Sequence, residues 1–285
     1  MKVGIQLYSV RNNMEKDPLA TIKKVAATGY RYLEGANHNA KNDAGVGFGV
    51  PAAEMKKLLS EAGARVVSCH INPLLDETID PILAYHCEIG SKYLASDMEF
   101  FGDKDEILRK AEKFNTLGQK CADAGITLLY HNHFHEFQMF GEQSVYDIFM
   151  SHTDPDLVKI ELDTYWALRG GQDPLDLLEQ YGKRVRLIHQ KDFPEALKEQ
   201  INLIDVVNRG DICVDYEYFE SVVSKDAFTE IGTGLMDIQR IIDKGNEACG
   251  CEYIILEQDY TALDEMESIH VSMENFKKFE GIRWE

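Results

Sequence analysis

The stretch that decides the fold covers residues 158–193 and reads VKIELDTYWALRGGQDPLDLLEQYGKRVRLIHQKDF. It begins and ends with β-rich apolar runs, at residues 158–166 and 185–193. Between these runs, residues 174–181 place apolar side chains at three- and four-residue steps, which is the spacing of an amphipathic helix. Asp173 is a typical N-cap residue, and a proline follows it at the first helical position. The stretch therefore predicts one strand, one helix and a second strand.

The same unit repeats along the whole chain. Predicted strands occupy residues 3–10, 30–35, 64–71, 92–98, 126–133, 158–166, 185–193 and 253–259. Segments with helical periodicity lie between them, for example at 18–28, 52–62, 105–124, 144–152, 174–181 and 236–248. This alternation predicts an α/β fold, a (β/α)8 TIM barrel forming a single domain over residues 1–285, because such barrels typically have roughly 250 residues. A doubly wound open sheet is the alternative, but the turn after the first predicted strand lacks its G-x-G-x-x-G pattern.

Two connections are longer than the others. Residues 37–50, which are rich in glycine and asparagine, follow the second predicted strand, and the polar residues 194–231 follow the seventh. Loops of this length in compact domains are usually functional. In a barrel both would emerge at the carboxyl ends of the strands, where active sites lie. We therefore expect both connections to border the site.

The composition excludes some classes of function. The chain has 30 Lys and Arg against 49 Asp and Glu, a net charge of −19, whereas nucleic-acid binding depends on clustered Lys and Arg. The sequence shows neither a signal-peptide pattern at its start nor a run of about 20 apolar residues that could span a membrane. The six cysteines are scattered, which predicts reduced thiols and no cysteine–zinc site. We expect a cytoplasmic protein with no nucleic-acid or membrane partner, and leave open whether it forms a homo-oligomer.

Polar side chains end the last four predicted strands. These ends read Tyr130-His131-Asn132-His133-Phe134-His135-Glu136, Glu161-Leu162-Asp163-Thr164-Tyr165-Trp166, His189-Gln190-Lys191-Asp192 and Leu256-Glu257-Gln258-Asp259. The carboxyl ends of consecutive barrel strands surround one pocket, so these groups converge. Carboxylates that meet without a cation repel one another, and mixed oxygen and nitrogen donors suit a transition metal better than Ca²⁺. The pattern predicts one divalent ion, such as Mn²⁺, Co²⁺, Zn²⁺ or Mg²⁺, and no other cofactor.

These motifs, together with the opening Gly4-Ile5-Gln6-Leu7-Tyr8-Ser9, resemble the xylose-isomerase-like TIM barrels. That group contains sugar phosphate isomerases/epimerases, inosose dehydratases, ketose 3-epimerases and 3-keto-glycoside-processing enzymes. The resemblance covers essentially the whole chain. It implies a barrel that binds one divalent metal at the ends of the late strands.

The resemblance also implies the metal ligands, which are Glu136, Asp163, His189 and Glu257. The first position has an alternative. An ungapped comparison with the ketose epimerases places His131 there, whereas the Asn-His-x-x-Glu-Phe pattern of closer relatives points to Glu136. We predict Glu136, because a carboxylate can act both as a hard ligand and as a proton carrier.

The mechanism implied by the resemblance begins at a substrate carbonyl. The metal acidifies the neighbouring C–H bond and stabilises an enediolate, and Glu136 and Glu257 are the predicted acid/base pair. The predicted function is a metal-dependent isomerase or epimerase of a small, unphosphorylated sugar or keto-sugar. A metal-dependent lyase, which dehydrates an inosose or keto-polyol or eliminates a 3-keto-glycoside, is the alternative, and a non-catalytic sugar-binding barrel comes third.

Several further side chains are predicted to contact a small carbohydrate substrate. These are Tyr8, His70, His131, His133, Trp166 and Lys191. For Lys191, two residues beyond His189 on the same strand face, an ion pair with Asp192 or Glu161 is the alternative interpretation. For His70, the alternative is a structural hydrogen bond.

Overall fold

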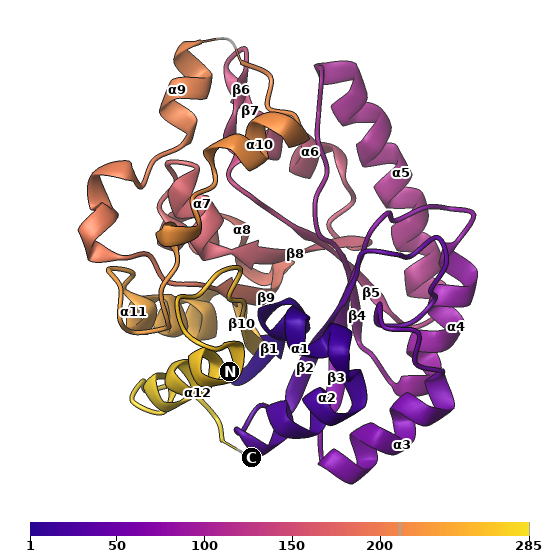
Figure 1. The fold of residues 1–285 in the computed structure, drawn as a ribbon. Helices are drawn as coiled ribbons and strands as arrows, with labels where there is room; N and C mark the ends of the chain where they lie inside the picture. The colour runs from indigo at the N-terminus through magenta and orange to yellow at the C-terminus, as the bar shows by residue number, and fades with distance from the viewer. Residues whose placement is uncertain (211, 285) are drawn as a thin grey trace.

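Eight parallel strands close into a barrel in a computed structural model that describes residues 1–210 and 212–284 (Figure 1). Their order around the barrel is β1-β10-β9-β8-β5-β4-β3-β2. The strands are β1 (Lys2–Gln6), β2 (Tyr32–Asn37), β3 (Arg65–Ile71), β4 (Tyr93–Ser96), β5 (Thr127–His131), β8 (Val158–Asp163), β9 (Val185–Gln190) and β10 (Tyr253–Leu256). The predicted TIM barrel is confirmed. Each of the eight strands pairs with two neighbours, so the sheet has no edge strand, which excludes an open doubly wound sheet.

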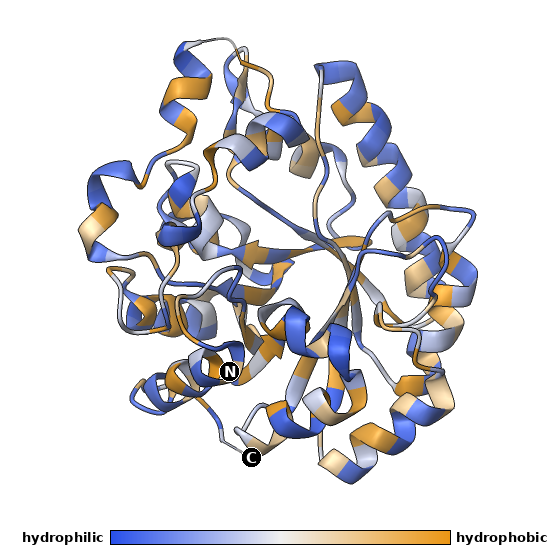
Figure 2. Cartoon of the chain, in the orientation of Figure 1, coloured by the Kyte–Doolittle hydropathy of each residue, from blue (hydrophilic) through white to orange (hydrophobic). Residues whose placement is uncertain are grey.

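Helices surround the barrel and turn their apolar faces towards it (Figure 2). They are α1 (Arg11–Lys16), α2 (Pro18–Ala27), α3 (Ala52–Ala62), α4 (Ile79–Ile89), α5 (Lys104–Asp123), α6 (Val145–His152), α7 (Thr164–Arg169), α8 (Pro174–Tyr181), α9 (Ile204–Arg209), α10 (Tyr216–Val222), α11 (Ile238–Lys244) and α12 (Glu265–Phe276). Carboxylate caps begin several of them: the Asp17 side chain accepts a hydrogen bond from the Ala20 amide, and Asp103 accepts one from Glu106. No helix in the described part of the chain is long and apolar enough to cross a membrane.

Six of the eight predicted strands extend too far at their carboxyl ends; the strands predicted at 30–35 and 64–71 do not, since β2 ends at Asn37 and β3 at Ile71. After Gln6 the chain forms a 3-10 helix at Leu7–Val10, and after Asp163 it enters α7. Most residues of both segments are buried. Their apolar pattern therefore continues beyond the strand, and periodicity alone does not mark where the strand ends.

The barrel interior changes from apolar to polar along the strands. Its apolar layer consists of Val67, Ala95, Leu129, Leu187, Tyr253 and Ile255, with Tyr32 and Tyr93 packed against it. Alternate residues of a strand point to the same side, so the side chains two positions further on form the next interior layer. In this way Leu187 is followed by His189, Leu129 by His131 and Ile255 by Glu257. The apolar layer thus forms the base beneath a polar layer.

The long connection after β9 folds over the carboxyl end of the barrel. It contains α9 and α10, which lie at the upper edge of Figure 1 near the short strands β6 (Met139–Phe140) and β7 (Gln143–Ser144). The Met139 amide donates to Asn208 Oδ1 at 2.9 Å, which ties the connection to this hairpin. The end of the connection, where the chain comes back to the barrel, is fixed by Asp192. The carboxylate of Asp192 accepts hydrogen bonds from the amides of Gly232, Gly234 and Met236 at 2.9–3.1 Å. Asp192 therefore anchors the connection.

Candidate functional site

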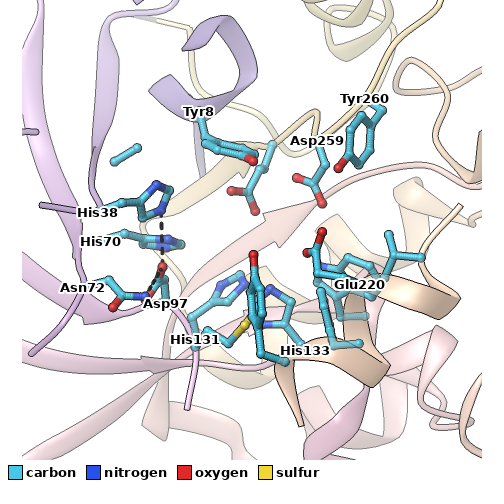
Figure 3. Close-up of a pocket in the computed structure, with 17 residues that line it drawn as sticks. Tyr8, His38, His70, Asn72, Asp97, His131, His133, Glu220, Asp259 and Tyr260 are labelled. Atoms are coloured by element: carbon cyan, nitrogen blue, oxygen red, sulfur yellow. Dashed lines mark hydrogen bonds and ion pairs between the residues drawn. The ribbon is translucent and has the colours of Figure 1, made fainter. Parts of the chain in front are cut away.

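A cavity of about 370 Å³ opens at the carboxyl end of the barrel, within the usual range of 300–1,000 Å³ for small-molecule pockets. Both long connections reach it, as expected: His38 comes from the connection after β2, and Tyr216, Phe219 and Glu220 come from α10. Of the side chains predicted to contact substrate, the cavity is lined by Tyr8, His70, His131, His133 and Trp166. Figure 3 shows most of these groups facing a common space.

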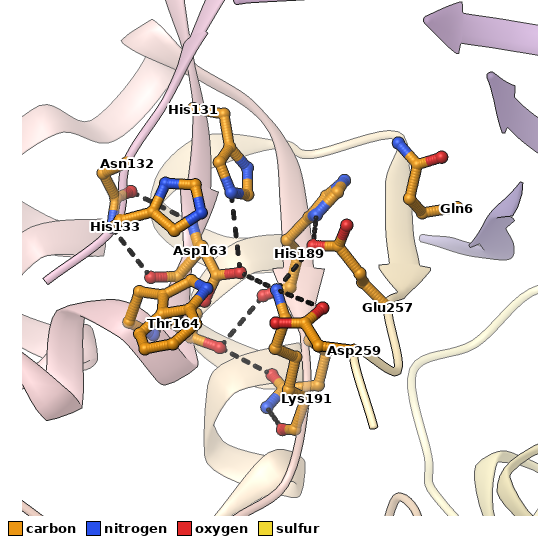
Figure 4. A network of polar contacts seen from close by, with 12 residues as sticks. Gln6, His131, Asn132, His133, Asp163, Thr164, His189, Lys191, Glu257 and Asp259 are labelled. Atoms are coloured by element: carbon orange, nitrogen blue, oxygen red, sulfur yellow. Dashed lines mark hydrogen bonds and ion pairs between the residues drawn. The ribbon is translucent and has the colours of Figure 1, made fainter. Parts of the chain in front are cut away.

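Four metal-competent side chains converge beside this cavity (Figure 4). They are His131, Asp163, His189 and Glu257, and each offers one ligand atom such that all four atoms lie within 4.8 Å of one another. All four are buried, and they come from β5, β8, β9 and the residue after β10. The strand ends therefore bring together groups that are more than 100 residues apart at the extremes, as the barrel geometry predicts.

The two histidines of this cluster each present one ring nitrogen to it and the other to Glu161. His131 Nε2 lies 3.8 Å from Asp163 Oδ2, while its Nδ1 lies 3.2 Å from Glu161 Oε1. His189 Nδ1 lies 3.0 Å from Glu257 Oε2, while its Nε2 lies 2.8 Å from the same Glu161 oxygen. A carboxylate on the far nitrogen of a ligating histidine sets its tautomer and ring orientation. Glu161 occupies that position for both rings.

A second polar group lies on the other side of these histidines. His70 Nε2 lies 2.6 Å from Glu161 Oε1, His189 contacts Glu34, and Gln6 donates to Glu34 at 3.1 Å. Burial opposes charge on His70, but Glu34 and Glu161 outweigh it and raise the pKa of His70 to about 9. The set His70, His131, Glu161 and His189 also brings four ligand atoms within 4.8 Å of one another. Ion pairs join its members, as they join those of the first cluster.

Lys191 lies against the first cluster. Its Nζ is 2.6 Å from Asp163 Oδ2, also contacts Glu257 Oε2, and is 3.8 Å from Asp259 Oδ1. Lys191 is about 1% exposed, yet Asp163, Asp259 and Glu257 overcome the effect of burial and hold its pKa well above the usual value. The sequence analysis gave an ion pair of Lys191 with Asp192 or Glu161 as the alternative interpretation. In the structure Lys191 instead pairs with Asp163 and Glu257.

Two carboxylates that follow β10 differ in their pKa. Burial raises the pKa of Asp259 to about 7, with Glu257 and Asp163 adding to the effect and Lys191 opposing it. Burial also acts on Glu257, but Lys191 and His189 hold the pKa of Glu257 well below its usual value. Pairs of carboxylates whose surroundings separate their pKa values are typical of acid/base sites.

Glu136, the predicted first ligand, does not lie in this cluster. Strand β5 ends at His131, and the chain then turns so that Glu136 falls in a 3-10 helix at His135–Phe137. Its oxygens accept hydrogen bonds from the Tyr130 hydroxyl and the His133 amide, both at 2.9 Å. Tyr130 packs in the core between barrel and helices. Glu136 is therefore not among the four clustered side chains, whereas the alternative residue, His131, is.

Several residues of the site were not among the predicted metal ligands or substrate contacts. Glu161 and Glu34 contact the histidines, and Asp97, Asn72 and Glu220 line the cavity. One signal was available for Asp97, since it directly follows β4 in the way that the metal-competent residues follow the later strands. For Glu220 the sequence offers only its place in the long connection after β9.

Comparison with known proteins identifies the family of this barrel. Residues 96–269 match the family model described as xylose isomerase-like TIM barrel. An inosose dehydratase of Geobacillus kaustophilus (strain HTA426) is 32% identical over 139 residues, which cover 49% of this chain and 41% of that enzyme. The chain spans between 41% and 52% of the length of the first curated relatives it matches.

Solved structures of other proteins match this fold over almost the whole chain. A sugar phosphate isomerase/epimerase from Parabacteroides distasonis has a TM-score of 0.77 at 25% identity, covering 99% of this chain and 95% of that one. A protein named IOLI, solved with a bound zinc atom, has a TM-score of 0.65 at 13% identity over 97% and 96% of the two chains, which shows a shared fold. The barrel, the convergent strand ends and the family match agree: the chain belongs to the xylose isomerase-like TIM barrel family.

Proposed function

We propose that this protein is a divalent-metal-dependent isomerase or epimerase that moves a proton next to the carbonyl of a small keto-sugar or keto-polyol. The observation that supports this most directly is the convergence of His131, Asp163, His189 and Glu257 beside the cavity. Two of these residues, His131 and Glu257, also line the cavity, so a bound substrate would lie against the metal-competent groups.

The donor set fits a divalent metal ion. Two carboxylates and two imidazoles within 4.8 Å are the mixed oxygen and nitrogen donors that transition metals accept. The far nitrogens of both histidines face Glu161, as is usual for ligating histidines. We therefore assign His131, rather than Glu136, as the first ligand. When bound, the ion would polarise the substrate carbonyl as a Lewis acid and so acidify the neighbouring C–H bond.

The protein groups beside the cluster suit proton transfer. Glu257 lines the cavity, and we assign its carboxylate to accept the proton from the substrate carbon. Asp259 also lines the cavity, and we assign it to return the proton. The pair Glu257 and Asp259 thus replaces the predicted pair Glu136 and Glu257. The Lys191 ammonium, between Asp163 and Glu257, would supply positive charge near the oxygen on which negative charge develops.

A lyase is the second candidate. It is favoured by the similarity of this chain to inosose dehydratases. Dehydration and isomerisation share the first step, proton removal by Glu257. In dehydration, Asp259 would instead protonate a departing β-hydroxyl. The products separate the two reactions, because a lyase releases one water and an isomerase retains the mass of the substrate.

Hydrogen exchange in D2O tests the shared step. The protein loaded with Mn²⁺ or Co²⁺ is incubated with a panel of ketoses, inososes and 3-keto-glycosides, and deuterium at the carbon beside the carbonyl is followed by NMR. We expect deuterium to enter with the wild type and not with Glu257→Gln, whereas the surface control Glu54→Gln retains exchange. Exchange that persists after metal removal, or in Glu257→Gln, would contradict the proposal. Binding with no exchange on any member would support a sugar-binding barrel instead.

A further inference from the structure

The Asp259 carboxylate is not held by hydrogen bonds of its own. Among the described residues, no group donates a hydrogen bond to its side chain, and its ion pair with Lys191 is long, at 3.8 Å. Strand β10 ends at Leu256, so Asp259 lies three residues beyond the sheet, in irregular backbone. The position of this carboxylate in the cavity wall therefore depends on the contacts that hold the main chain around it.

Arg11 holds that main chain. Its Nη2 donates a hydrogen bond to the Asp259 carbonyl oxygen at 2.6 Å, and its Nη1 donates one to the Tyr8 carbonyl oxygen at 3.1 Å. The planar guanidinium can make both bonds at once because its donors are fixed in a fork. Nearby, the Gln258 amide donates to Ser9 Oγ at 2.9 Å. These contacts join the segment after β1 to the segment after β10.

Arg11 also packs against two aromatic side chains of the cavity wall. Its Cζ lies 4.3 Å from the centre of the Tyr8 ring and 5.4 Å from that of Tyr260. Figure 3 shows Tyr8, Asp259 and Tyr260 on the same side of the cavity. Arg11 itself is not among the described residues that line the cavity. It can therefore influence a substrate only through these neighbours.

Arg11 in turn is anchored by the last helix. It is the first residue of α1, and the next two residues are bound to Glu265 at the start of α12. Glu265 Oε1 accepts from the amide and the side chain of Asn12 at 3.1 and 2.7 Å, and its Oε2 accepts from those of Asn13 at the same two distances. Four hydrogen bonds to one carboxylate fix this short helix against α12. The guanidinium is thus presented to Asp259 from a fixed support.

Glu257 does not depend on Arg11 in this way. It directly follows β10, and its amide donates to the Gln190 carbonyl oxygen of β9 at 3.2 Å, which ties it to the sheet. Its carboxylate contacts Lys191. The two carboxylates assigned to proton transfer therefore have separate supports, the sheet for Glu257 and Arg11 for Asp259.

We propose that Arg11 is a positioning residue that holds Asp259 where it can return the proton to the substrate. The proposal rests on the proposed function, in which Glu257 removes the proton and Asp259 returns it. Loss of Arg11 should therefore slow the return step and spare the removal step. The same split applies to a lyase, because there Asp259 would protonate the departing hydroxyl.

Comparing deuterium exchange with product formation tests this split. When Glu257 removes a proton in D2O, its carboxyl group exchanges with solvent, and the return of deuterium from Glu257 to the same carbon labels the unreacted substrate. Product forms only when Asp259 is the donor. The metal-loaded protein is incubated with each ketose, inosose and 3-keto-glycoside of the panel, and NMR follows the deuterium in the remaining substrate and the amount of product. The ratio of these two rates is the readout.

Arg11→Met is the main variant. Methionine is unbranched like arginine but has no donor, and a shift of about 1 Å in a reacting group can cost about 100-fold in rate. We expect product formation to fall about 100-fold, while deuterium labelling of the substrate stays within about 3-fold of the wild type. Arg11→Lys keeps the charge without the fork, so its rate of product formation should lie between those of Arg11→Met and the wild type. Asp259→Asn should show the same split as Arg11→Met, and the exposed control Arg109→Met should match the wild type.

A measurement without substrate tests the same contact. Hydrogen–deuterium exchange followed by mass spectrometry reports how firmly residues 257–264 are held, with and without metal. We expect these amides to exchange faster in Arg11→Met than in the wild type, and those of α5 to exchange equally in both. Glu265→Gln keeps one of the two acceptor oxygens, so it should speed the exchange of residues 11–13 and, to a smaller degree, that of residues 257–264. Because this variant leaves Arg11 in place, it serves if Arg11→Met fails to fold.

This inference and the proposed function fail in different ways. Equal exchange of residues 257–264 in Arg11→Met and the wild type would overturn the inference. So would a variant in which these residues loosen while product formation and substrate labelling fall by the same factor, because Arg11 would then be purely structural. If the wild type labels no member of the panel, or if Asp259→Asn forms product at the wild-type rate, the proposed function or its proton donor is wrong, and the inference falls with it.

Discussion

The ammonium of Lys191 lies 2.6 Å from Asp163 Oδ2, in contact with a carboxylate that belongs to the proposed metal-ligand set. The same ammonium contacts Glu257, a second member of that set. Lys191 therefore supplies positive charge at the two carboxylates that a divalent ion would also use. We expect the lysine and the ion to compete for these oxygens.

Replacing Lys191 with methionine tests this competition. Without the ammonium, Asp163 and Glu257 are left as buried carboxylates without their cation, and breaking such a pair typically costs roughly 3–5 kcal/mol. We expect the melting temperature of the metal-free variant to lie well below that of the wild type. We also expect added Mn²⁺ or Co²⁺ to raise the melting temperature of the variant more than that of the wild type. Thermal unfolding with and without metal measures both effects. The control is Lys92→Met, which removes an exposed ion pair with Glu252. If metal raises the melting temperature of Lys191→Met and of the wild type equally, the lysine and the ion do not compete.

The first ligand position can be decided by two substitutions of similar size. His131→Gln is expected to lose most of the bound metal, because His131 Nε2 faces Asp163. Glu136→Gln is expected to retain it, because the Glu136 oxygens already bind Tyr130 and the His133 amide. Elemental analysis after metal loading, with about one ion per chain in the wild type, measures the outcome. Metal lost from Glu136→Gln and kept in His131→Gln would restore Glu136 as the ligand.

Glu161 is expected to act through the histidines rather than on the substrate. Its Oε1 faces His131 Nδ1 and His189 Nε2 at 3.2 and 2.8 Å, so Glu161→Gln should disturb the tautomer of both rings. Losing such a partner typically weakens metal binding about 10- to 100-fold. A chelator-competition titration gives the affinity, and the visible spectrum of the Co²⁺ form reports ligand geometry. An unchanged spectrum and affinity would show that Glu161 does not position the rings.

His86 predicts how stability depends on pH. It is buried in α4 with Nδ1 3.0 Å from Ser91 Oγ, and burial lowers its pKa to about 4, with Gly45 and Asp43 opposing only in part. Below about pH 6.5 the unfolded chain takes up a proton that the native state refuses, so the stability present above that pH is lost as pH falls towards 4. We expect roughly 2 kcal/mol of this loss between pH 7.5 and pH 5.

Denaturant unfolding at the two pH values measures this loss. In His86→Gln, most of this loss of stability between the two pH values should disappear. The exposed control His270→Gln should lose as much stability as the wild type. A wild type and His86→Gln that lose the same stability would show that His86 is not the source.

Much of the fold follows from local sequence pattern. The helices predicted at 52–62 and 174–181 coincide with α3 and α8, because caps and apolar spacing act within a few residues. The alternation of strands and helices implied helices at the places of α4 and α12, but the sequence analysis gave no bounds for them, although both carry apolar residues at helical spacing.

The site was predictable in its position and only partly in its members. Asp163, His189 and Glu257 meet because each lies within one residue of the end of a barrel strand, and the strand ends share one face. Glu136 was assigned to the same place from its motif, but a turn of a few residues after β5 decides where its carboxylate points. Local pattern does not encode the direction of that turn.

The sequence by itself determined the barrel and the set of strands whose ends bear metal-competent side chains, because strand and helix periods and strand-end residues are local properties. Only the tertiary structure decided that Glu161 binds the far nitrogens of both histidines and that Asp97 lies across the cavity from Asp259. These relationships join residues from different strands, and their geometry depends on the register and closure of the whole barrel.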